Sequence, residues 1–381
     1  MDNKYVRTGW SQDIRALLKD ISAPDTTLFV VYYGSDAPVQ DIYRALKDTG
    51  RYFLGCTDAG RFTDNHYLLD STSIAGMSLS GELFEKLAFG TVDMQSGTGY
   101  DAMRAASRAA LEKAAESIRL DLANPDMGKE FVINLLYGLN SATPFLEGQA
   151  LAGMMLQTVG GSSGGKTDFK ISNVMCHLGM GNIGAFGLFR LNDKFSFLMD
   201  RVSSFRKIAG KELVVTKTAA PRHILEFNGK PAAGEYCRLL NLDVQALSPD
   251  VFARYTLGIE PGDNERLITS IMKRDDAGNG FLVYNDVFDG LAFNLYESMD
   301  QAPDRQAIYS RISRNKVIAF LSFDCILCYL ARNTEEKTSL MSGVYAKNLQ
   351  EIPKIGFGTF SENICGANIN QTETFLALYS R

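Results

Sequence analysis

The chain contains few of the residues that most often bind metals or cross-link a fold. Three of its 381 residues are histidine (His66, His177 and His223), which leaves few options for a metal site. Its six cysteines are Cys56, Cys176, Cys237, Cys325, Cys328 and Cys365. Because they lie far apart in a long chain, they are typical of reduced thiols rather than of a disulfide framework. We therefore expect a cytoplasmic protein.

An excess of positive charge and a long hydrophobic segment are absent as well. Lysine and arginine number 39 against 44 acidic residues, which gives a net charge of −5, and no basic run stands out. This balance argues against binding to nucleic acid. The longest apolar run, residues 317–331, contains Asp324 and is shorter than the roughly 20 residues that span a bilayer. With no apolar segment at the N-terminus either, we expect neither a secretory signal nor a membrane anchor.

The apolar residues that are present predict an α/β fold. Their share of 45%, with 22% charged residues, is ordinary for a globular protein, and 381 residues are enough for two domains. Runs rich in β-branched and aromatic residues, such as 27–33 and 130–136, predict buried strands. Apolar residues spaced three and four apart predict helices, most clearly at 101–122 and also at 144–157. We expect two domains of mixed β-sheet with helices packed on the outer faces.

One pattern occurs three times along the chain. A strand, a helix and a short strand are followed by a turn rich in glycine, serine and threonine, near residues 57–60, 159–167 and 354–360. The helix of the third copy is predicted at 335–349. In parallel βαβ units such turns lie at the carboxyl ends of the strands, where ligands commonly bind. We therefore expect recurring strand-helix-strand units whose turns share one edge of the sheet.

A section rich in predicted strands separates the second and third copies. Short alternating segments occur between residues 168 and 298, and Asn228-Gly229 is the signal of a type I′ hairpin turn. The pattern breaks near residues 205–220. We therefore place the two domains at residues 1–215 and 216–381.

The second turn matches the spacing of a phosphate-binding P-loop. Gly160, Gly165, Lys166 and Thr167 stand in the motif positions. A P-loop also needs a helix that begins at its lysine and threonine, because the helix N-terminus helps to hold the phosphate. Residues 168–176 alternate like a strand instead. We favour a glycine turn that leads into a strand, and a nucleotide-binding enzyme using Gly160–Thr167 stays an alternative.

Four motifs follow one another in a fixed order. They are Gly160-Gly-Ser-Ser-Gly164, then residues 222–236 with an Asn-Gly turn before a Pro-Ala-Ala helix, then Phe323-Asp-Cys-Ile-Leu327 with residues 356–362, and last Asn370-Gln-Thr372. Together they resemble the FIST domain family, a bacterial intracellular sensory module with N- and C-terminal halves. The resemblance covers about residues 27–379. It implies that the protein senses a small ligand, so we expect no enzyme activity and no catalytic residue.

The motifs of the C-terminal half are similar to those of stand-alone family members described as nitric-oxide sensors. Such proteins bind haem and regulate a partner histidine kinase, so the resemblance implies a haem cofactor and a kinase partner. The chain departs from their pattern at two positions. Cys328 stands in place of an arginine, and Ala367 stands in place of a histidine ahead of Asn370. The alternative is a sensor of a small organic metabolite, such as an amino acid, without haem.

Two histidines are candidates for the haem iron. His223 is preferred because its neighbour Arg222 could pair with a propionate, and His177 is the alternative. The pair Cys325-x-x-Cys328 also suggests redox or metal chemistry. It lies in an apolar run with no strong turn or charge nearby, so we interpret it as two buried, unreactive thiols.

Polar residues on the three turns form the predicted ligand site. Hydroxyls, an amide pair and backbone N–H groups suit a small polar or zwitterionic ligand. The predicted ligand-binding residues are Thr57, Asp58, Gly160, Gly161, Ser162, Ser163, Arg222, Thr359, Glu362, Asn370 and Gln371. The simpler interpretation is that these residues cap the ends of strands.

Overall fold

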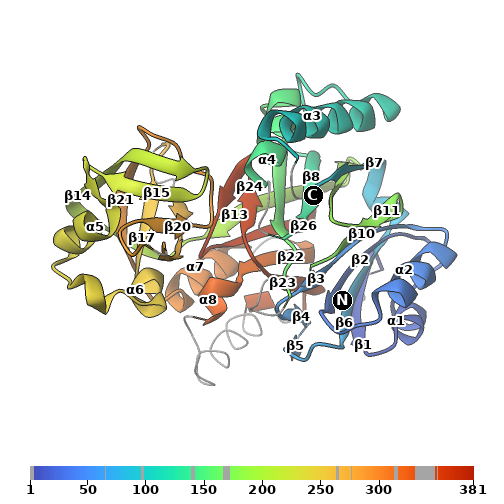
Figure 1. Ribbon diagram of the computed structural model, residues 1–381. Coiled ribbons are helices and arrows are strands. Elements are labelled where there is room, and N and C mark those ends of the chain that lie inside the picture. The colour runs from blue at the N-terminus through green and yellow to red at the C-terminus, as the bar shows by residue number, and fades with distance from the viewer. Residues whose placement is uncertain are drawn as a thin grey trace.

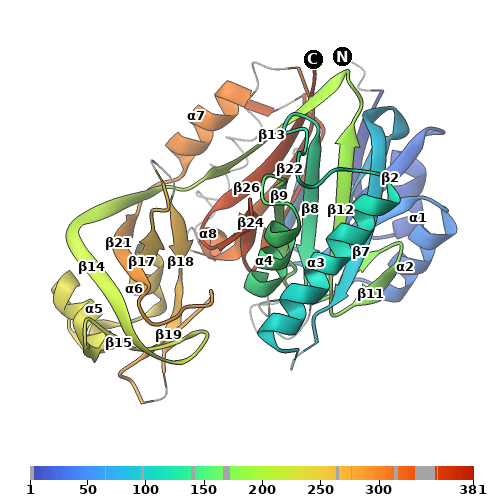
Figure 2. The same cartoon turned by 90° about the horizontal axis from the view of Figure 1, so that it is seen from above.

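The computed structural model describes residues 4–64, 66–95, 98–138, 142–165, 172–262, 266–275, 277–312, 316–330, 348–349 and 351–381. In these residues the chain forms a body of three six-stranded sheets and a smaller domain of antiparallel strands over residues 205–298 (Figure 1). Figure 2 shows the small domain beside the body, with the long strand β14 (Phe205–Ala220) leading into it. The predicted α/β class, with two domains and recurring strand-helix-strand units, is confirmed.

The same order of elements builds each of the three sheets, and we call each set a unit. The order is strand, helix, strand, helix, strand, hairpin, strand. Unit 1 comprises β1 (Val6–Ser11), α1 (Ile14–Ile21), β2 (Thr26–Gly34), α2 (Val39–Asp48), β3 (Tyr52–Asp58), β4 (Arg61–Thr63), β5 (His66–Leu68) and β6 (Ile74–Ser80). Unit 2 comprises β7 (Phe84–Asp93), α3 (Tyr100–Ser117), β8 (Glu130–Leu136), α4 (Ala142–Ala152), β9 (Gln157–Ser162), β10 (Val174–Cys176), β11 (Gly179–Gly181) and β12 (Ile183–Leu191). Unit 3 comprises β13 (Phe195–Val202), α7 (Ala302–Ile312), β22 (Val317–Cys325), α8 (Ile326–Leu330), β23 (Lys354–Thr359), β24 (Glu362–Ile364), β25 (Ala367–Ile369) and β26 (Glu373–Ser380).

The small domain is inserted into unit 3, between β13 and α7. Besides β14 it contains β15 (His223–Phe227), β16 (Lys230–Pro231), α5 (Ala232–Leu240), α6 (Pro249–Arg254), β17 (Tyr255–Ile259), β18 (Leu267–Thr269), β19 (Ile271–Arg274), β20 (Phe281–Val283) and β21 (Ala292–Ser298). Its first and last strands pair, with Phe205 opposite Ser298. The predicted domain boundary between residues 215 and 216 therefore falls inside β14, and residues 299–381 return to the body.

The hairpin of each unit is added to the sheet of another unit. The hairpin β10–β11 of unit 2 pairs with β3, the hairpin β24–β25 of unit 3 pairs with β9, and the hairpin β4–β5 of unit 1 pairs with β23. The strand orders of the three sheets are consequently the same: β1-β6-β2-β3-β10-β11, β7-β12-β8-β9-β24-β25 and β13-β26-β22-β23-β4-β5. No sheet is complete without strands from a second unit.

The central strands are buried on both faces, which explains their continuous apolar sequences. In β2, Leu28 and Val30 face a core shared by all three sheets, whereas Phe29 and Val31 face α1 and α2. Helices α3 and α4 cover the outer face of the second sheet in the same way, and α7 contributes to the cover of the third. A cavity of about 10 Å³ remains in the shared core, lined by apolar side chains including Leu28.

Several predicted elements differ from those observed. The helix predicted at 144–157 ends at Ala152, just before Gly153. The glycine turn predicted at 159–167 is largely the strand β9, and the helix predicted at 335–349 lies almost wholly outside the described residues. At the predicted type I′ turn, Asn228 and Gly229 have φ angles of 53° and 74°, as that turn requires. In the part of the chain that the structure describes, no helix is long and apolar enough to cross a bilayer.

The hairpin exchange predicts which fragments of the chain fold alone. A fragment of residues 204–299 keeps its paired end strands and its own hydrophobic core, so we expect a cooperative thermal transition by circular dichroism. A fragment of residues 1–230 lacks β22, β23 and β26, and β4 and β9 lose their unit 3 partners β23 and β24, so we expect no such transition. A cooperative transition for residues 1–230 would contradict the proposed dependence of each sheet on two units.

Candidate functional site

The three predicted turns meet in one place, which we call the junction. It is the point where β3, β9 and β23 end and where each of these strands contacts the hairpin of a neighbouring unit. Six backbone hydrogen bonds close the junction in a ring: Thr57 N to Asn173 O (2.9 Å), Gly164 N to Thr57 O (3.0 Å), Ser162 N to Ser361 O (2.8 Å), Phe360 N to Ser162 O (3.1 Å), Gly358 N to Gly60 O (2.6 Å) and Ala59 N to Gly358 O (3.3 Å). Thr57, Ser162 and Gly358 therefore occupy equivalent positions in the three units.

The side chains at the junction are fully buried and closely packed. Thr57, Ser162, Ser163 and Thr359 are each at most 1% exposed. The Ser162 hydroxyl lies 2.9 Å from the Ser361 hydroxyl, and Asn173 N donates to Thr57 Oγ1 at 2.8 Å. The three predicted turns thus lie together, and at the junction the Ser162 hydroxyl contacts the Ser361 hydroxyl while the Thr57 hydroxyl accepts from a backbone N–H.

Gly160, the first glycine of the P-loop pattern, and its neighbour Gly161 serve this packing. Gly160 and Gly161 lie in β9 and pair with both β8 and β24. A Cβ on Gly161 would lie 2.4 Å from Thr359 Cγ2, so only glycine lets β9 approach β23 this closely. Gly160 therefore lies in a strand that is paired on both sides, and not in the open loop that would cradle a phosphate. Lys166 and Thr167 lie outside the described residues.

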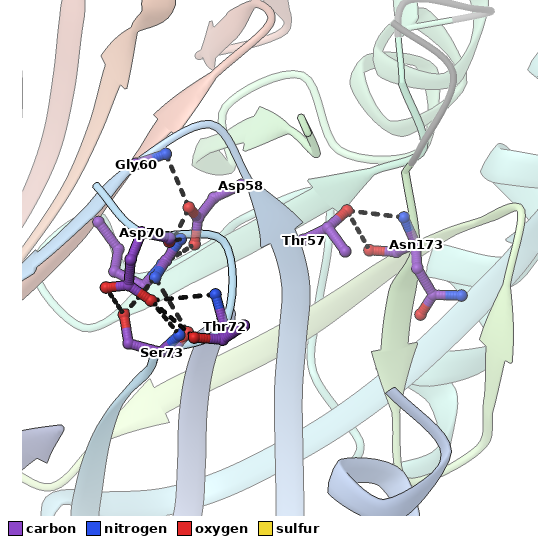
Figure 3. A network of polar contacts seen from close by, with 8 residues as sticks. Thr57, Asp58, Gly60, Asp70, Thr72, Ser73 and Asn173 are labelled. Carbon is purple, nitrogen blue, oxygen red and sulfur yellow. Dashed lines mark hydrogen bonds and ion pairs between the residues drawn. The ribbon is translucent and has the colours of Figure 1, made fainter. Parts of the chain in front are cut away.

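At the unit 1 side of the junction, Asp58 is held by a buried arginine that sequence analysis missed. Arg61 is 1% exposed, and its Nε donates to Asp58 Oδ2 at 2.8 Å. Its other nitrogens donate to Ser73 O at 2.9 Å and to Asp70 O at 3.0 Å. Burial raises the pKa of Asp58, and the charge of Arg61 opposes this. Figure 3 shows the network around these residues, in which Asp58 also accepts from Gly60 N and Asp70 accepts from Ser73 N.

Asp70 organises the loop ahead of β6 through the same network. Its carboxylate accepts from Ser73 N at 2.6 Å, from Ser73 Oγ at 2.7 Å and from Thr72 N at 3.0 Å. Partial burial raises the pKa of Asp70, but these hydrogen bonds outweigh it and lower the pKa to about 2. The loop is therefore fixed by a charged carboxylate at neutral pH.

The equivalent position of unit 3 carries an acid in place of Arg61. Glu362 pairs opposite Gly161 as Arg61 pairs opposite Phe357. Its carboxyl accepts from the Thr359 hydroxyl and, at 3.4 Å, from Thr372 N. Burial, and then the neighbouring Cys328 and Asp324, raise the pKa of Glu362 well above its usual range. The nearby Arg305 bonds to other acids, Asp324 at 2.7 Å and Glu373 at 2.6 Å.

Beyond Glu362 the body meets the small domain, at the motif Asn370-Gln-Thr372. Ser270 N donates to Asn370 Oδ1 at 3.2 Å, and Ser270 Oγ donates to Gln371 Oε1 at 2.8 Å. Gln371 Nε2 donates to Ala253 O at 2.9 Å. Asn368 Nδ2 donates a further hydrogen bond to Asn285 Oδ1 at 2.9 Å. We call this group (Asn368, Asn370, Gln371, Ser270 and Asn285) the amide site.

Two buried polar atoms of the amide site have no hydrogen-bond partner among the described residues. They are Asn370 Nδ2, a donor, and Asn368 Oδ1, an acceptor. Asn370 is fully buried, and its amide orientation follows from the bond that its Oδ1 accepts from Ser270 N. Because buried polar groups are nearly always paired, an unpaired donor and an unpaired acceptor two residues apart in the sequence call for an explanation. A small polar ligand would supply both partners.

The remaining predicted residues lie apart from the junction. Arg222 Nε donates to Asp286 at 2.9 Å, and His223 Nε2 lies 3.0 Å from Asp275 Oδ2, both within the small domain. The His177 ring packs edge-on against Tyr52 and Phe89, with ring centroids 4.8 and 4.7 Å away. Burial and the charge of Lys47 lower the pKa of His177.

Comparison with known proteins identifies two matching domain patterns. The FIST N domain matches residues 27–230, and the FIST C domain matches residues 232–365. No curated protein matches the chain. Among solved structures, cyanuric acid hydrolase from A. caulinodans aligns over 99% of both chains with 7% identity and a TM-score of 0.40. A second cyanuric acid hydrolase structure aligns over 99% of both chains with 9% identity and a TM-score of 0.37.

The sequence analysis excluded enzyme activity, and this exclusion is wrong. Two solved structures that align over 99% of the chain are those of cyanuric acid hydrolase, an enzyme. At identities of 7% and 9%, the likeness indicates a shared fold at most, so no hydrolase activity is carried over to this chain.

The buried pair of Asp58 and Arg61 predicts a large loss of stability on substitution. In Arg61→Met the Asp58 charge stays buried without its partner. We therefore expect the free energy of unfolding, measured in urea, to fall by about 3–5 kcal/mol. The double variant Asp58→Asn with Arg61→Met should lose less than the two single variants summed. As a control, Arg44→Met removes an exposed pair with Asp41 and should cost under about 1 kcal/mol. Equal losses in Arg61→Met and Arg44→Met would contradict the role given to Arg61.

Proposed function

The chain belongs to the FIST family, whose domains are sensory ligand-binding domains of signalling proteins, and we propose that its ligand binds at the amide site. The observation that carries this proposal is that two side chains of the site are unpaired, Asn370 with a buried donor and Asn368 with a buried acceptor. A ligand with one hydrogen-bond acceptor and one donor would pair both. Carboxylate and ammonium or amide groups meet this requirement, so the ligand class is a small organic metabolite such as an amino acid.

The position of the site suggests how binding would be transmitted. The amide site joins β25 and the residues after it to β18 and to the segment after β20, and so joins the body to the small domain. A ligand that bonds to both sides favours one arrangement of the two domains over others. We propose that the output is a contact with a partner protein. In line with the similarity to nitric-oxide sensors, a histidine kinase is the first partner to test.

A haem-based nitric-oxide sensor is the second candidate function. The observation in its favour is the pair of His223 and Asp275, because a metal-binding histidine usually donates its other ring nitrogen to a carboxylate. Iron would then be held by His223 Nδ1. Arg222 is bonded to Asp286 and does not fit the role of propionate partner. Bound haem would supply an iron that takes up nitric oxide.

The amino-acid proposal predicts a change in thermal stability. With the common amino acids added one at a time, we expect one or a few to raise the melting temperature measured by scanning fluorimetry. At about one hundred times its dissociation constant, a ligand adds about 2.7 kcal/mol, or roughly 4 °C for a chain of this size. Asn370→Ala and Asn368→Ala should remove the shift, whereas Asn294→Ala, on β21 of the small domain, should retain it. A shift that survives in both site variants would exclude the amide site.

The haem proposal predicts an absorption spectrum. After addition of haemin, a sharp Soret band that moves with nitric oxide and is lost in His223→Ala would support it. A band that persists in His223→Ala would direct attention to His177 or Cys325. A protein with no specific band, together with a thermal shift from an amino acid, would leave the organic ligand as the function.

A further inference from the structure

Three asparagines and a glycine lie in one row across the second sheet. The strand register places Asn134 of β8 opposite Gly160 of β9. It also places Asn363 of β24 between Gly160 on one side and Asn368 of β25 on the other. Side chains of residues paired in this way share one face of a sheet. This face is the one that α4 covers, because Gln149 of α4 is bonded to Asn134 (Figure 2).

The glycine of the row lets Asn134 reach Asn363 across β9. A Cβ on Gly160 would lie 1.9 Å from Asn134 O, so no other residue fits there. Asn134 Nδ2 lies 3.5 Å from Asn363 Oδ1, and the same amide exchanges two hydrogen bonds with Gln149, at 2.8 and 2.9 Å. The Asn363 oxygen is therefore directed at Asn134, and Asn363 Nδ2 lies on the side away from it.

The row continues to the small domain with one bond missing. Asn368 Nδ2 donates to Asn285 Oδ1 at 2.9 Å, and Asn285 Nδ2 donates to Asn368 O at 3.0 Å. Asn363 Nδ2, a donor, and Asn368 Oδ1, an acceptor, are both buried without a partner among the described residues. Asn363 is 1% exposed. We call the whole set (Gln149, Asn134, Asn363, Asn368 and Asn285) the amide row.

The hairpin geometry brings the two unpaired groups close together. The loop of the hairpin β24–β25 is Cys365 and Gly366, with φ angles of 47° and 80°, as in a type I′ turn. In such a hairpin the pair next to the loop is hydrogen-bonded, and the next pair, Asn363 and Asn368, is not. The Cβ atoms of a pair of this second kind are about 4.5–5.5 Å apart. One polar group with an acceptor and a donor can therefore contact both side chains.

We propose that Asn363 and Asn368 bind a carboxamide group of the ligand. This inference rests on the proposed function, in which a ligand binds at the amide site, and it adds Asn363 to that site. A primary carboxamide offers a carbonyl oxygen to Asn363 Nδ2 and an N–H to Asn368 Oδ1. The pair of Asn134 and Gln149 is bonded in this way within the same row, since each amide donates to the other.

The uncharged surroundings favour a carboxamide over a carboxylate or an ammonium group. Among the described residues, the side chains of the amide row bond to one another, to the Thr269 hydroxyl and to backbone carbonyls. A charged group buried here would lose its hydration without gaining an ionic partner. A carboxylate also lacks the donor that Asn368 Oδ1 needs. The ligand class is therefore a small neutral carboxamide, which among the common amino acids means asparagine or glutamine.

The test compares carboxamides with their matching carboxylates on the full-length protein. The pairs are glutamine with glutamate, asparagine with aspartate, and acetamide with acetate. Melting temperatures identify the compounds that bind, and calorimetry gives their dissociation constants. We expect glutamine or asparagine to bind at least about a hundredfold more tightly than its carboxylate, because a site that bonds an N–H rejects the analogue without it.

Two substitutions of Asn363 test its part in binding. Asn363→Asp and Asn363→Ser both remove the Nδ2 donor, so each should weaken carboxamide binding about tenfold or more. The serine variant adds no charge and replaces the aspartate variant if circular dichroism shows that the buried carboxylate prevents folding. Asn294→Ser, on β21 of the small domain, is the matched control and should bind the carboxamide as the unaltered protein does.

Three results would overturn the inference while the proposed function stands. The first is an amino acid other than asparagine or glutamine that binds and is lost in Asn370→Ala, while no carboxamide binds. The second is a carboxylate that binds as tightly as its carboxamide. The third is carboxamide binding that is lost in Asn370→Ala but unchanged in folded Asn363→Ser. If no amino acid and no carboxamide binds, or if binding is unchanged in Asn363→Ser, Asn368→Ala and Asn370→Ala alike, both proposals fail.

Discussion

The ring of backbone hydrogen bonds at the junction is the constraint on which the rest of the structure depends. In each unit the central pair of parallel strands ends in a turn. The hairpin that follows pairs with a strand of a neighbouring sheet. The ring closes only when all three units are present, because Thr57, Ser162 and Gly358 each bond to a different neighbour. This arrangement leaves little freedom for the backbone at the junction. Chemical differences between the units must therefore come from side chains.

One position of each unit shows how far those side chains have diverged. The first residue of the hairpin strand that joins the next sheet is Arg61 in unit 1, Val174 in unit 2 and Glu362 in unit 3. Arg61 neutralises Asp58 and completes a closed network, and Val174 is part of the apolar core. Glu362 instead accepts from the Thr359 hydroxyl, and burial raises its pKa well above the usual range. In unit 3 this position thus carries a buried acid with a raised pKa. Unit 3 is also the unit that contains the inserted small domain.

The sequence predicted those features that depend on local patterns. Strands such as β2 and β8 were predictable because burial on both faces requires a continuous apolar run. The turns were predictable as a group because they recur after similar strands. The hairpin exchange was not, because β4, β10 and β24 have three residues each and their partners are distant in sequence. Arg61 and Asn368 carry no signal of their own in one sequence. Gly160 and Gly161 were predicted to lie in a turn because a glycine-rich sequence does not tell a turn from a strand that needs close packing.

The insertion of the small domain into unit 3 links the chemistry of the site to movement. Because the strands at its two ends pair with each other, the chain enters and leaves the small domain side by side. Its contacts with Asn370 and Gln371 are hydrogen bonds through short polar side chains, which discriminate between arrangements by direction as well as by distance. An unpaired amide at this contact raises the free energy of the empty state, by about 1–3 kcal/mol for a buried group. A ligand that pairs it regains that free energy only in the arrangement that forms the site. A ligand at the proposed site would therefore couple its binding to the arrangement of the two domains through a modest number of polar contacts.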